Sequence, residues 1–355
     1  MSKKTHIGVV GCGSVCEMYL DFLSCCGEVE ISACCDLNMA STRTMASRYS
    51  IGRVMALEDM LADPSIDIIL NLTDPKAHYP INLQALEAGK SVFSEKPCAL
   101  TYKECLRLMK VARENKVVFY SAPDTYLANS VKTANDALRN GSIGEPIAVS
   151  IISTCRPVED WHPNPLHFYM KGGGPLYDRG VYFITTLVSL LGAVKSVSAF
   201  SHTANPRRSI MRKGVTHTVK VTTPTHFSIL LKFKNGTVAT MIVSFEAACD
   251  IGQPDVFDIF GTEGILSLSS PMYYDGIIRK YSVSTGKWGK MHTPPMNPAY
   301  KGDRRGAGIL DMIKFIKTRG KENRNIKLAS HVIDVMDTVE DSERKKRSLE
   351  VNSNL

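Results

Sequence analysis

The chain has 355 residues, of which 44% are apolar and 22% are charged. This balance excludes a largely disordered chain, and the length favours two domains over a single core. No apolar run reaches the length of a membrane-spanning helix, and the apolar run that follows the first few polar residues is too short for a signal-peptide core.

Charge and cysteine usage narrow the possible functions further. The net charge is +8, but the basic residues are scattered and lack interleaved aromatic residues, so we expect no nucleic-acid partner. The ten cysteines include no CxxC pair, which disfavours both disulfide bonds and a metal site. The sequence therefore predicts a cytoplasmic protein with no membrane partner and no bound metal.

Strand and helix patterns alternate through the first 120 residues. Short apolar runs predict strands, and stretches with helical spacing separate them. The expected strands are 6–10, 29–35, 66–72, 91–94 and 117–120, and the expected helices are 14–26, 42–49, 81–88 and 102–115. The alternation predicts a doubly wound parallel sheet of the Rossmann type in a first domain, residues 1–122.

Strands follow one another without intervening helices in most of the second half. The expected strands are 146–154, 196–201, 219–221, 225–234, 237–245, 255–260 and 264–268, with helices at 175–191, 306–318 and 329–342. Asn235-Gly236 is a typical two-residue hairpin turn. We expect residues 123–355 to form an α+β domain with a large, mostly antiparallel open sheet, which binds substrate and offers a face for a homodimer or homotetramer.

The first strand leads into the glycine-rich sequence Gly11-Cys12-Gly13-Ser14-Val15-Cys16. In a dinucleotide-binding turn the first glycine makes the tight turn, and the second lets the backbone approach a pyrophosphate at the helix N-terminus. The third position takes a small residue for helix–strand packing, and a cysteine there departs from the usual glycine or alanine. By itself the motif is a weak signal, compatible with a turn in another kind of α/β domain.

Asp36 strengthens this interpretation, because it ends the second strand 20 residues after Cys16. An acidic residue there accepts hydrogen bonds from the ribose hydroxyls of the cofactor and repels the 2′-phosphate of NADP. No arginine follows it, so NAD is favoured over NADP.

Polar residues also follow the next two strands. The third strand is followed by Thr73, with His78 five residues later, and the fourth ends before Glu95-Lys96-Pro97. Strand ends in such sheets face the ligand crevice, so these residues are candidates for contact with the nicotinamide cofactor and a substrate hydroxyl.

With these residues in place, the sequence resembles the Gfo/Idh/MocA oxidoreductase family. The resemblance rests on Thr73, His78 and the run from Ala85 through Gly89-Lys90 to Glu95-Lys96-Pro97, and it extends more loosely over the second half. It implies that Lys96 contacts the substrate hydroxyl and assists proton transfer. Oxidation of a secondary alcohol releases a proton that some group must accept; without the resemblance Lys96 is an ordinary strand-end lysine.

The family also has a glycine-rich loop before a helix that carries an aspartate and, four residues later, a histidine. Here Asp178 matches the aspartate, but Tyr182 stands where histidine is usual. The i, i+4 spacing puts both side chains on one helix face, and a nearby cation such as Lys96 can lower a tyrosine pKa. This arrangement makes Tyr182 the candidate proton carrier in place of histidine, and Asp178 a candidate catalytic residue that binds a sugar hydroxyl. The alternatives are a core tyrosine and a first-turn helix aspartate.

The segment before that loop combines aromatic and polar residues. Arg156, Trp161, His162 and His167 suit a sugar site, where rings stack on the sugar and donors pair with its hydroxyls. A rigid structural loop is the alternative, and either histidine is a second candidate for the acid–base group.

Three functions remain open at this point. The first is an NAD-dependent oxidoreductase that moves a hydride between nicotinamide and a secondary alcohol or ketone of a sugar, cyclitol or glycoside. The second is a glycoside-processing enzyme whose tightly bound NAD is recycled by transient oxidation. The third is a non-catalytic NAD(H)-binding regulator, which would have no need of Lys96 as a proton relay.

Overall fold

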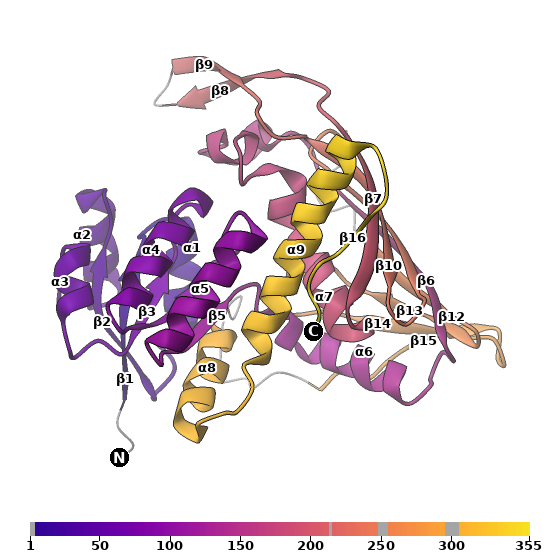
Figure 1. Cartoon of the computed structure of the whole chain (residues 1–355), viewed down its shortest axis with the longest axis horizontal. Helices are drawn as coiled ribbons and strands as arrows, with labels where there is room; N and C mark the ends of the chain where they lie inside the picture. The colour runs from indigo at the N-terminus through magenta and orange to yellow at the C-terminus, as the bar shows by residue number, and fades with distance from the viewer. Residues whose placement is uncertain (1–3, 213–214, 248–254, 295–304) are drawn as a thin grey trace. The chain divides into compact units, whose positions relative to one another are not determined.

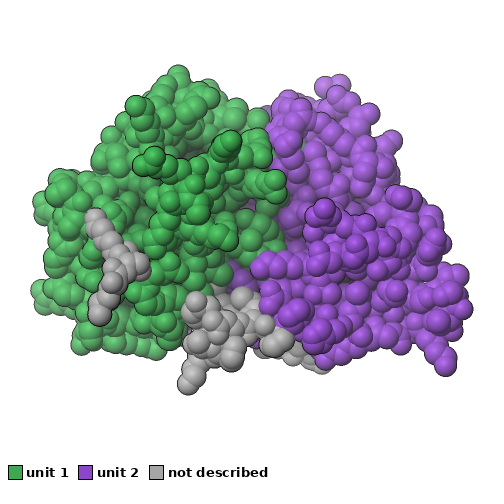
Figure 2. Space-filling model, turned by 90° about the horizontal axis from the view of Figure 1, so that it is seen from below, with its two compact units in different colours: residues 1–127, 295–333 green, residues 128–294, 334–355 purple. Residues whose placement is uncertain are grey.

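The computed structural model describes residues 4–212, 215–247, 255–294 and 305–355 (Figure 1). The chain divides into two compact units, which Figure 2 shows in different colours. Unit 1 contains residues 1–127 and 295–333, and unit 2 contains residues 128–294 and 334–355.

Unit 1 is built on a five-stranded parallel sheet of order β2-β1-β3-β4-β5. Its strands are β1 (Thr5–Val10), β2 (Val29–Cys35), β3 (Ile68–Asn71), β4 (Ser91–Ser94) and β5 (Phe119–Ser121). The sheet confirms the predicted Rossmann-type fold. Strands β3 and β4 in its centre are almost wholly buried, as expected where helices cover both faces of a parallel sheet.

Helices alternate with these strands. They are α1 (Ser14–Leu23), α2 (Met39–Arg48), α3 (Leu57–Ala62), α4 (Pro75–Glu87) and α5 (Tyr102–Glu114), followed by the 3-10 turn η1 (Thr125–Leu127). The expected helix 81–88 begins six residues earlier than predicted, because Pro75 starts the first turn and Pro80 is accommodated inside the helix.

One further helix, α8 (Ala307–Thr318), belongs to unit 1 although the sequence pattern placed it in the second domain. Ile309, Met312 and Ile313 of α8 share a buried core with residues of α1 and of strands β1, β3 and β4. The Asp124 carboxylate accepts hydrogen bonds from the backbone N–H groups of Gly306 and Gly308, at 3.0 and 2.8 Å, and so caps this helix. These contacts join residues distant in sequence, which local patterns do not reveal.

Unit 2 contains a nine-stranded sheet of order β15-β14-β13-β12-β6-β11-β10-β7-β16. Its strands are β6 (Pro146–Thr154), β7 (Val194–His202), β10 (His226–Phe233), β11 (Val238–Ser244), β12 (Val256–Gly261), β13 (Gly264–Leu268), β14 (Ile278–Ser282), β15 (Lys287–Lys290) and β16 (Leu349–Glu350). The expectation of a large, mostly antiparallel sheet is confirmed. The pair β6–β11 is parallel, so the sheet is mixed.

The remaining elements of unit 2 cover or extend this sheet. They are α6 (Asn129–Arg139), the short turns η2 (Val158–Asp160) and η3 (Leu166–Tyr169), the π-helical turn η4 (Leu176–Gly180), and α7 (Val181–Leu191). Strands β8 (Arg207–Arg212) and β9 (Val215–Lys220) form a separate two-stranded ribbon (Figure 1). Helix α9 (Arg324–Lys345) contains the division between the units.

The hairpin predicted at Asn235-Gly236 is present, but its connection is longer than two residues. The Phe233 N–H donates to the Thr237 carbonyl at 2.9 Å, and the Gly236 N–H donates to the Phe233 carbonyl at 3.1 Å. Gly236 has φ of +96°, and no positive φ is found at Asn235. The turn is therefore a three-residue connection that needs glycine at its last position only.

The expectations about membrane-spanning helices and disulfide bonds can be compared with the described part of the chain. No helix there is long and apolar enough to cross a membrane. No disulfide joins the nine cysteines that the structure describes, and Cys249 lies outside the described residues.

Candidate functional site

The glycine-rich turn after β1 has the backbone that a dinucleotide site requires. Gly11 has φ of +99°, and a Cβ atom there would come within 2.7 Å of the Leu72 carbonyl group. A Cβ atom on Gly13 would meet nothing within 4 Å. Packing within the protein therefore requires a glycine at position 11. The absent side chain of Gly13 instead leaves open space at the start of α1, where backbone N–H groups attract an anion.

The carboxylate of Asp36 lies beside this turn. One of its oxygens accepts the Cys12 N–H at 2.7 Å, and the other accepts the Asn38 N–H at 2.7 Å. A carboxylate has about four acceptor positions, so both oxygens keep acceptor capacity for sugar hydroxyls. Asp36 thus orders the glycine-rich turn and remains able to bind a ribose.

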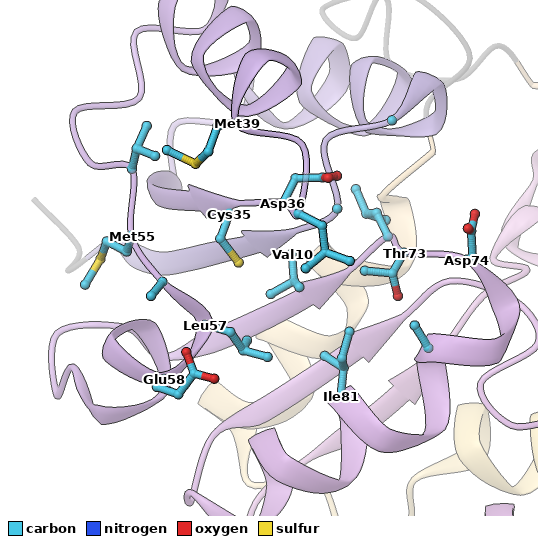
Figure 3. Close-up of a pocket in the computed structure, with 17 residues that line it drawn as sticks. Val10, Cys35, Asp36, Met39, Met55, Leu57, Glu58, Thr73, Asp74 and Ile81 are labelled. Carbon is cyan, nitrogen blue, oxygen red and sulfur yellow. The ribbon is translucent and has the colours of Figure 1, made fainter.

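A pocket of about 780 Å³ opens next to these residues, and Figure 3 shows Asp36, Val10 and Thr73 around it. Its volume is in the range of small-molecule sites. It is lined by Val10, Gly11, Gly13, Cys35, Asp36, Leu37, Met39, Val54, Met55, Ala56, Leu57, Glu58, Leu72, Thr73, Asp74, Ala77 and Ile81. The apolar walls suit an adenine ring, and the open space at Gly13 together with the Asp36 carboxylate fits NAD.

Of the predicted cofactor residues, Gly11, Gly13, Asp36 and Thr73 line this pocket. Five others lie outside its lining: Ser14, Val15, His78, Glu95 and Lys96. Ser14 begins α1, Val15 packs against the core of unit 1, and Lys96 is half-buried directly after β4.

His78 and Glu95 are buried and bonded within the protein. The His78 ring nitrogens lie 2.6 Å from the Pro97 carbonyl and 2.7 Å from the Thr73 carbonyl, so His78 connects the turns after β3 and β4. Burial lowers the pKa of His78. Glu95 accepts a hydrogen bond from the Tyr19 hydroxyl at 2.7 Å and one from the Lys96 N–H at 2.8 Å. Both residues hold the turn that carries Lys96.

The cysteines of the glycine-rich turn form a small buried group. The Cys12 thiol donates to the Cys35 carbonyl at 3.7 Å, and the Cys34 thiol donates to the Thr42 carbonyl at 3.9 Å. The neighbouring Cys16 and Cys34 side chains lower the pKa of Cys12. The side chain of Cys16 is fully buried in the core that α1 shares with the sheet. A cysteine therefore satisfies the small-residue position of the motif.

In unit 2, a glycine-rich turn precedes the candidate acid–base residues. Gly172 and Gly174 have φ of +87° and +80°, and a Cβ atom on Gly173 would lie 2.3 Å from the carbonyl oxygen of His167. The turn is consequently packed directly beneath the segment that contains His167 and Phe168.

The helix after this turn begins differently from the prediction. Residues Leu176–Gly180 form a π-helical turn, and the α-helix starts at Val181. Asp178 lies in the π-helical turn and Tyr182 in the first turn of α7, and their shared face stays a prediction. Tyr182 is 3% exposed, and Asp178 is half-buried.

The aromatic segment packs against itself and lies close to Asp178. The His162 ring lies 5.6 Å from those of Trp161 and His167, and 4.9 Å from the Phe168 ring, between centroids. Burial lowers the pKa of His162, while the nearby Asp178 carboxylate opposes this shift. Unit 2 therefore places Asp178 within electrostatic range of His162.

Arg156 belongs to the same segment, since its carbonyl accepts the Trp161 indole N–H at 3.4 Å. The Nε atom of Arg156 is buried and has no hydrogen-bond acceptor in the described part of the chain. A ligand oxygen could satisfy this group, because a buried donor without an acceptor is costly.

Several residues were not predicted from the sequence. Met39, Met55 and Glu58 line the cofactor pocket, and Tyr19 supports Glu95. Met39 could have been proposed as a pocket residue, because it lies three positions after Asp36. The other three residues come from segments without a recognisable motif.

Comparison with known proteins agrees with this architecture. Residues 5–122 match the Gfo/Idh/MocA oxidoreductase family with an NAD-binding Rossmann fold, and residues 131–267 match the C-terminal domain of the same family. The chain belongs to the Gfo/Idh/MocA family. Unit 1 thus contains an NAD-binding Rossmann fold.

Individual relatives are distant. D-glucoside 3-dehydrogenase of Escherichia coli is 29% identical over 209 residues, which cover 56% of this chain and 58% of the relative. Myo-inositol 2-dehydrogenase of Thermotoga maritima is 22% identical over 260 residues, 73% of each chain. A structure of levoglucosan dehydrogenase with NADH and levoglucosan has a TM-score of 0.86 at 19% identity, covering 99% of this chain and 100% of that one. At this identity the structural likeness shows the fold alone.

Proposed function

We propose that the protein is an NAD-dependent dehydrogenase that acts on a secondary alcohol or ketone of a sugar, cyclitol or glycoside. The observation that carries the proposal is the pocket at Gly13 and Asp36 in a chain of this oxidoreductase family. Relatives named as glucoside and inositol dehydrogenases support the substrate class.

Lys96 and Tyr182 handle the proton in this proposal. NAD, when bound, supplies the hydride acceptor. Lys96 follows a buried turn held by Glu95 and His78, which limits its motion. In this proposal Tyr182, as tyrosinate, takes the proton from the substrate hydroxyl, and Lys96 assists the transfer.

The substrate contacts come from unit 2. Asp178 accepts hydrogen bonds from substrate hydroxyls, Trp161 offers a ring face, and His162, His167 and Arg156 supply donors. The proximity of His162 to Asp178 and the unsatisfied Nε atom of Arg156 support this assignment.

We further propose that residues 1–122 bind NAD, and that residues 123–355 bind substrate and form the oligomer contact. Phe200 of β7 and Leu230 of β10 lie on the same face of the sheet. Their side chains are 70% and 49% exposed, so this face is the candidate contact between subunits. A charge at position 200 should weaken the contact. We therefore expect sedimentation analysis to show a smaller oligomer for Phe200→Glu than for wild type. The nine cysteines that the structure describes are free thiols, which supports a cytoplasmic location as part of this proposal.

The activity test mixes the purified protein with NAD or NADP and with glucosides, myo-inositol and levoglucosan, and follows the absorbance of reduced nicotinamide. We expect a signal with NAD. Lys96→Met and Tyr182→Phe should each lower kcat about 10²- to 10⁴-fold, the usual contribution of acid–base catalysis. Lys103→Met and Tyr281→Phe are controls of the same residue types and should retain wild-type rates.

The other outcomes lead to different functions. Retained NAD after purification and a glycoside cleaved without net reduction would indicate the internal redox cycle. NAD binding without turnover of any compound in the panel would contradict the dehydrogenase and leave the regulator.

A further inference from the structure

Arg179 lies between the two candidate residues Asp178 and Tyr182, but its side chain is directed to the sheet. Its Nε donates to the Ser153 hydroxyl at 2.8 Å, and its Nη2 donates to the Asp255 carboxylate at 2.7 Å. The side chains of Arg179 and Asp255 are 16% and 6% exposed. The guanidinium is therefore held in a buried site by two separate partners.

Those partners lie on neighbouring strands. Ser153 belongs to β6, and Asp255 directly precedes β12, where Val256 pairs with Ile152. The two partners thus lie at the same end of the β6–β12 pair. Two hydrogen bonds from a planar guanidinium fix both the distance and the orientation of the turn that bears it.

The turn that bears Arg179 has an unusual backbone geometry. Leu176–Gly180 is π-helical, a geometry that is rare and usually limited to one turn, often at functional sites. Gly180 packs against Leu176, with 3.3 Å between the expected Cβ position and Leu176 Cδ1. The hydrogen bonds of Arg179 give this turn an anchor outside the helix.

The energetics of a buried ion pair indicate that Arg179 and Asp255 position the turn more than they stabilise the fold. A buried pair costs desolvation that its attraction only partly recovers, and well-packed apolar residues often replace it with no loss of stability. The pair does provide directional bonds, which apolar residues cannot reproduce.

We infer that Arg179, anchored by Asp255 and Ser153, is a positioning residue that sets the locations of Asp178 and Tyr182 through the π-helical turn. This inference rests on the proposed function, because it assigns the placement of two residues that the proposal uses. A misplacement of about 1 Å can lower a rate about 10²-fold.

The test compares Arg179→Lys, Asp255→Asn and the double variant Arg179→Met/Asp255→Leu. With the sugar substrate that wild type oxidises, we expect Arg179→Lys and Asp255→Asn to lower kcat about 10- to 100-fold, with an unchanged KM for NAD. Each single variant should also lower the melting temperature. The double variant should melt at the wild-type temperature but keep the lowered kcat. Asn352→Ala removes a hydrogen bond to Asp334 elsewhere in unit 2 and controls for destabilisation alone.

Hydrogen exchange gives a second readout that needs no substrate. The amides of residues 176–182 should exchange faster in Arg179→Lys than in wild type and in Asn352→Ala. Recovery of kcat together with stability in the double variant would overturn the inference, as would wild-type kcat in Arg179→Lys. If wild type oxidises no compound, the proposed function fails separately, and unchanged exchange over residues 176–182 would then overturn the inference on its own.

Discussion

Replacing Asp36 should change both the affinity for NAD and the choice between NAD and NADP. Asp36→Asn keeps the shape of the side chain but exchanges one acceptor oxygen for a donor. Because the two oxygens accept the Cys12 and Asn38 N–H groups at 2.7 Å each, the amide can serve only one of them, and it loses the charge that strengthens hydrogen bonds from ribose hydroxyls.

The magnitude follows from these two effects. A hydrogen bond to a charged group contributes about 1.5–3 kcal/mol, so NAD should bind about 10- to 150-fold more weakly. Two unit charges 4 Å apart repel by about 1 kcal/mol even in water, so NADP should lose a repulsion worth about fivefold in affinity. The preference for NAD should therefore fall by about 50-fold or more.

Calorimetric titration of wild type and variant with each cofactor, at one ionic strength, measures this preference. Glu58→Gln is the matched control, since it removes a carboxylate from the same pocket wall without touching the glycine-rich turn. It should weaken NAD binding much less than Asp36→Asn. An unchanged ratio of NAD to NADP affinity in Asp36→Asn would refute the assignment of Asp36 to the ribose.

Other substitutions in unit 1 test its supports. Gly11→Ala should abolish NAD binding in a titration, because its Cβ would press on the Leu72 carbonyl group at 2.7 Å; wild-type affinity would contradict the steric argument. Tyr19→Phe should lower the unfolding free energy by about 2 kcal/mol and the melting temperature by about 4–8 °C, as the buried Glu95 loses a donor; an unchanged melting curve would argue against it. Burial lowers the pKa of His78, so the unfolded chain takes up a proton below about pH 6.5 that the folded chain does not. Stability in urea should fall as the pH drops through that value, and His78→Gln should flatten this dependence; equal slopes would count against His78 as its source.

The parallel half of the fold could be predicted well from local patterns. The strands 29–35 and 91–94 have the predicted bounds, because short segments rich in apolar residues alternate there with stretches of helical spacing. Gly11 and Asp36 were recognisable since their roles depend on backbone geometry and charge at fixed distances from a strand end.

Features that depend on distant contacts could not be predicted. The expected helix 175–191 begins with a π-helical turn, and hydrophobic spacing over five residues cannot separate it from an α-helix. Most residues of β9 are exposed, so no alternation of apolar and polar residues marks it, and only its end at residues 219–220 was expected. Strand β8, its partner in the ribbon, was not predicted. The parallel pairing of β6 with β11 is a property of topology that neither strand reveals alone.

The choice between Tyr182 and His162 as the proton acceptor can be argued from hydrogen bonding. His162 Nδ1 accepts the Asn164 N–H at 3.1 Å, so neutral His162 carries its proton on Nε2. That nitrogen can donate to a substrate hydroxyl but cannot take its proton, and Nδ1 is already engaged. We therefore expect His162→Gln to raise KM for the sugar and to leave kcat within about tenfold, unlike Tyr182→Phe. Steady-state kinetics of both variants decides the matter: a large kcat loss in His162→Gln alone would transfer the proton to His162, by a tautomer that requires the Asn164 contact to break.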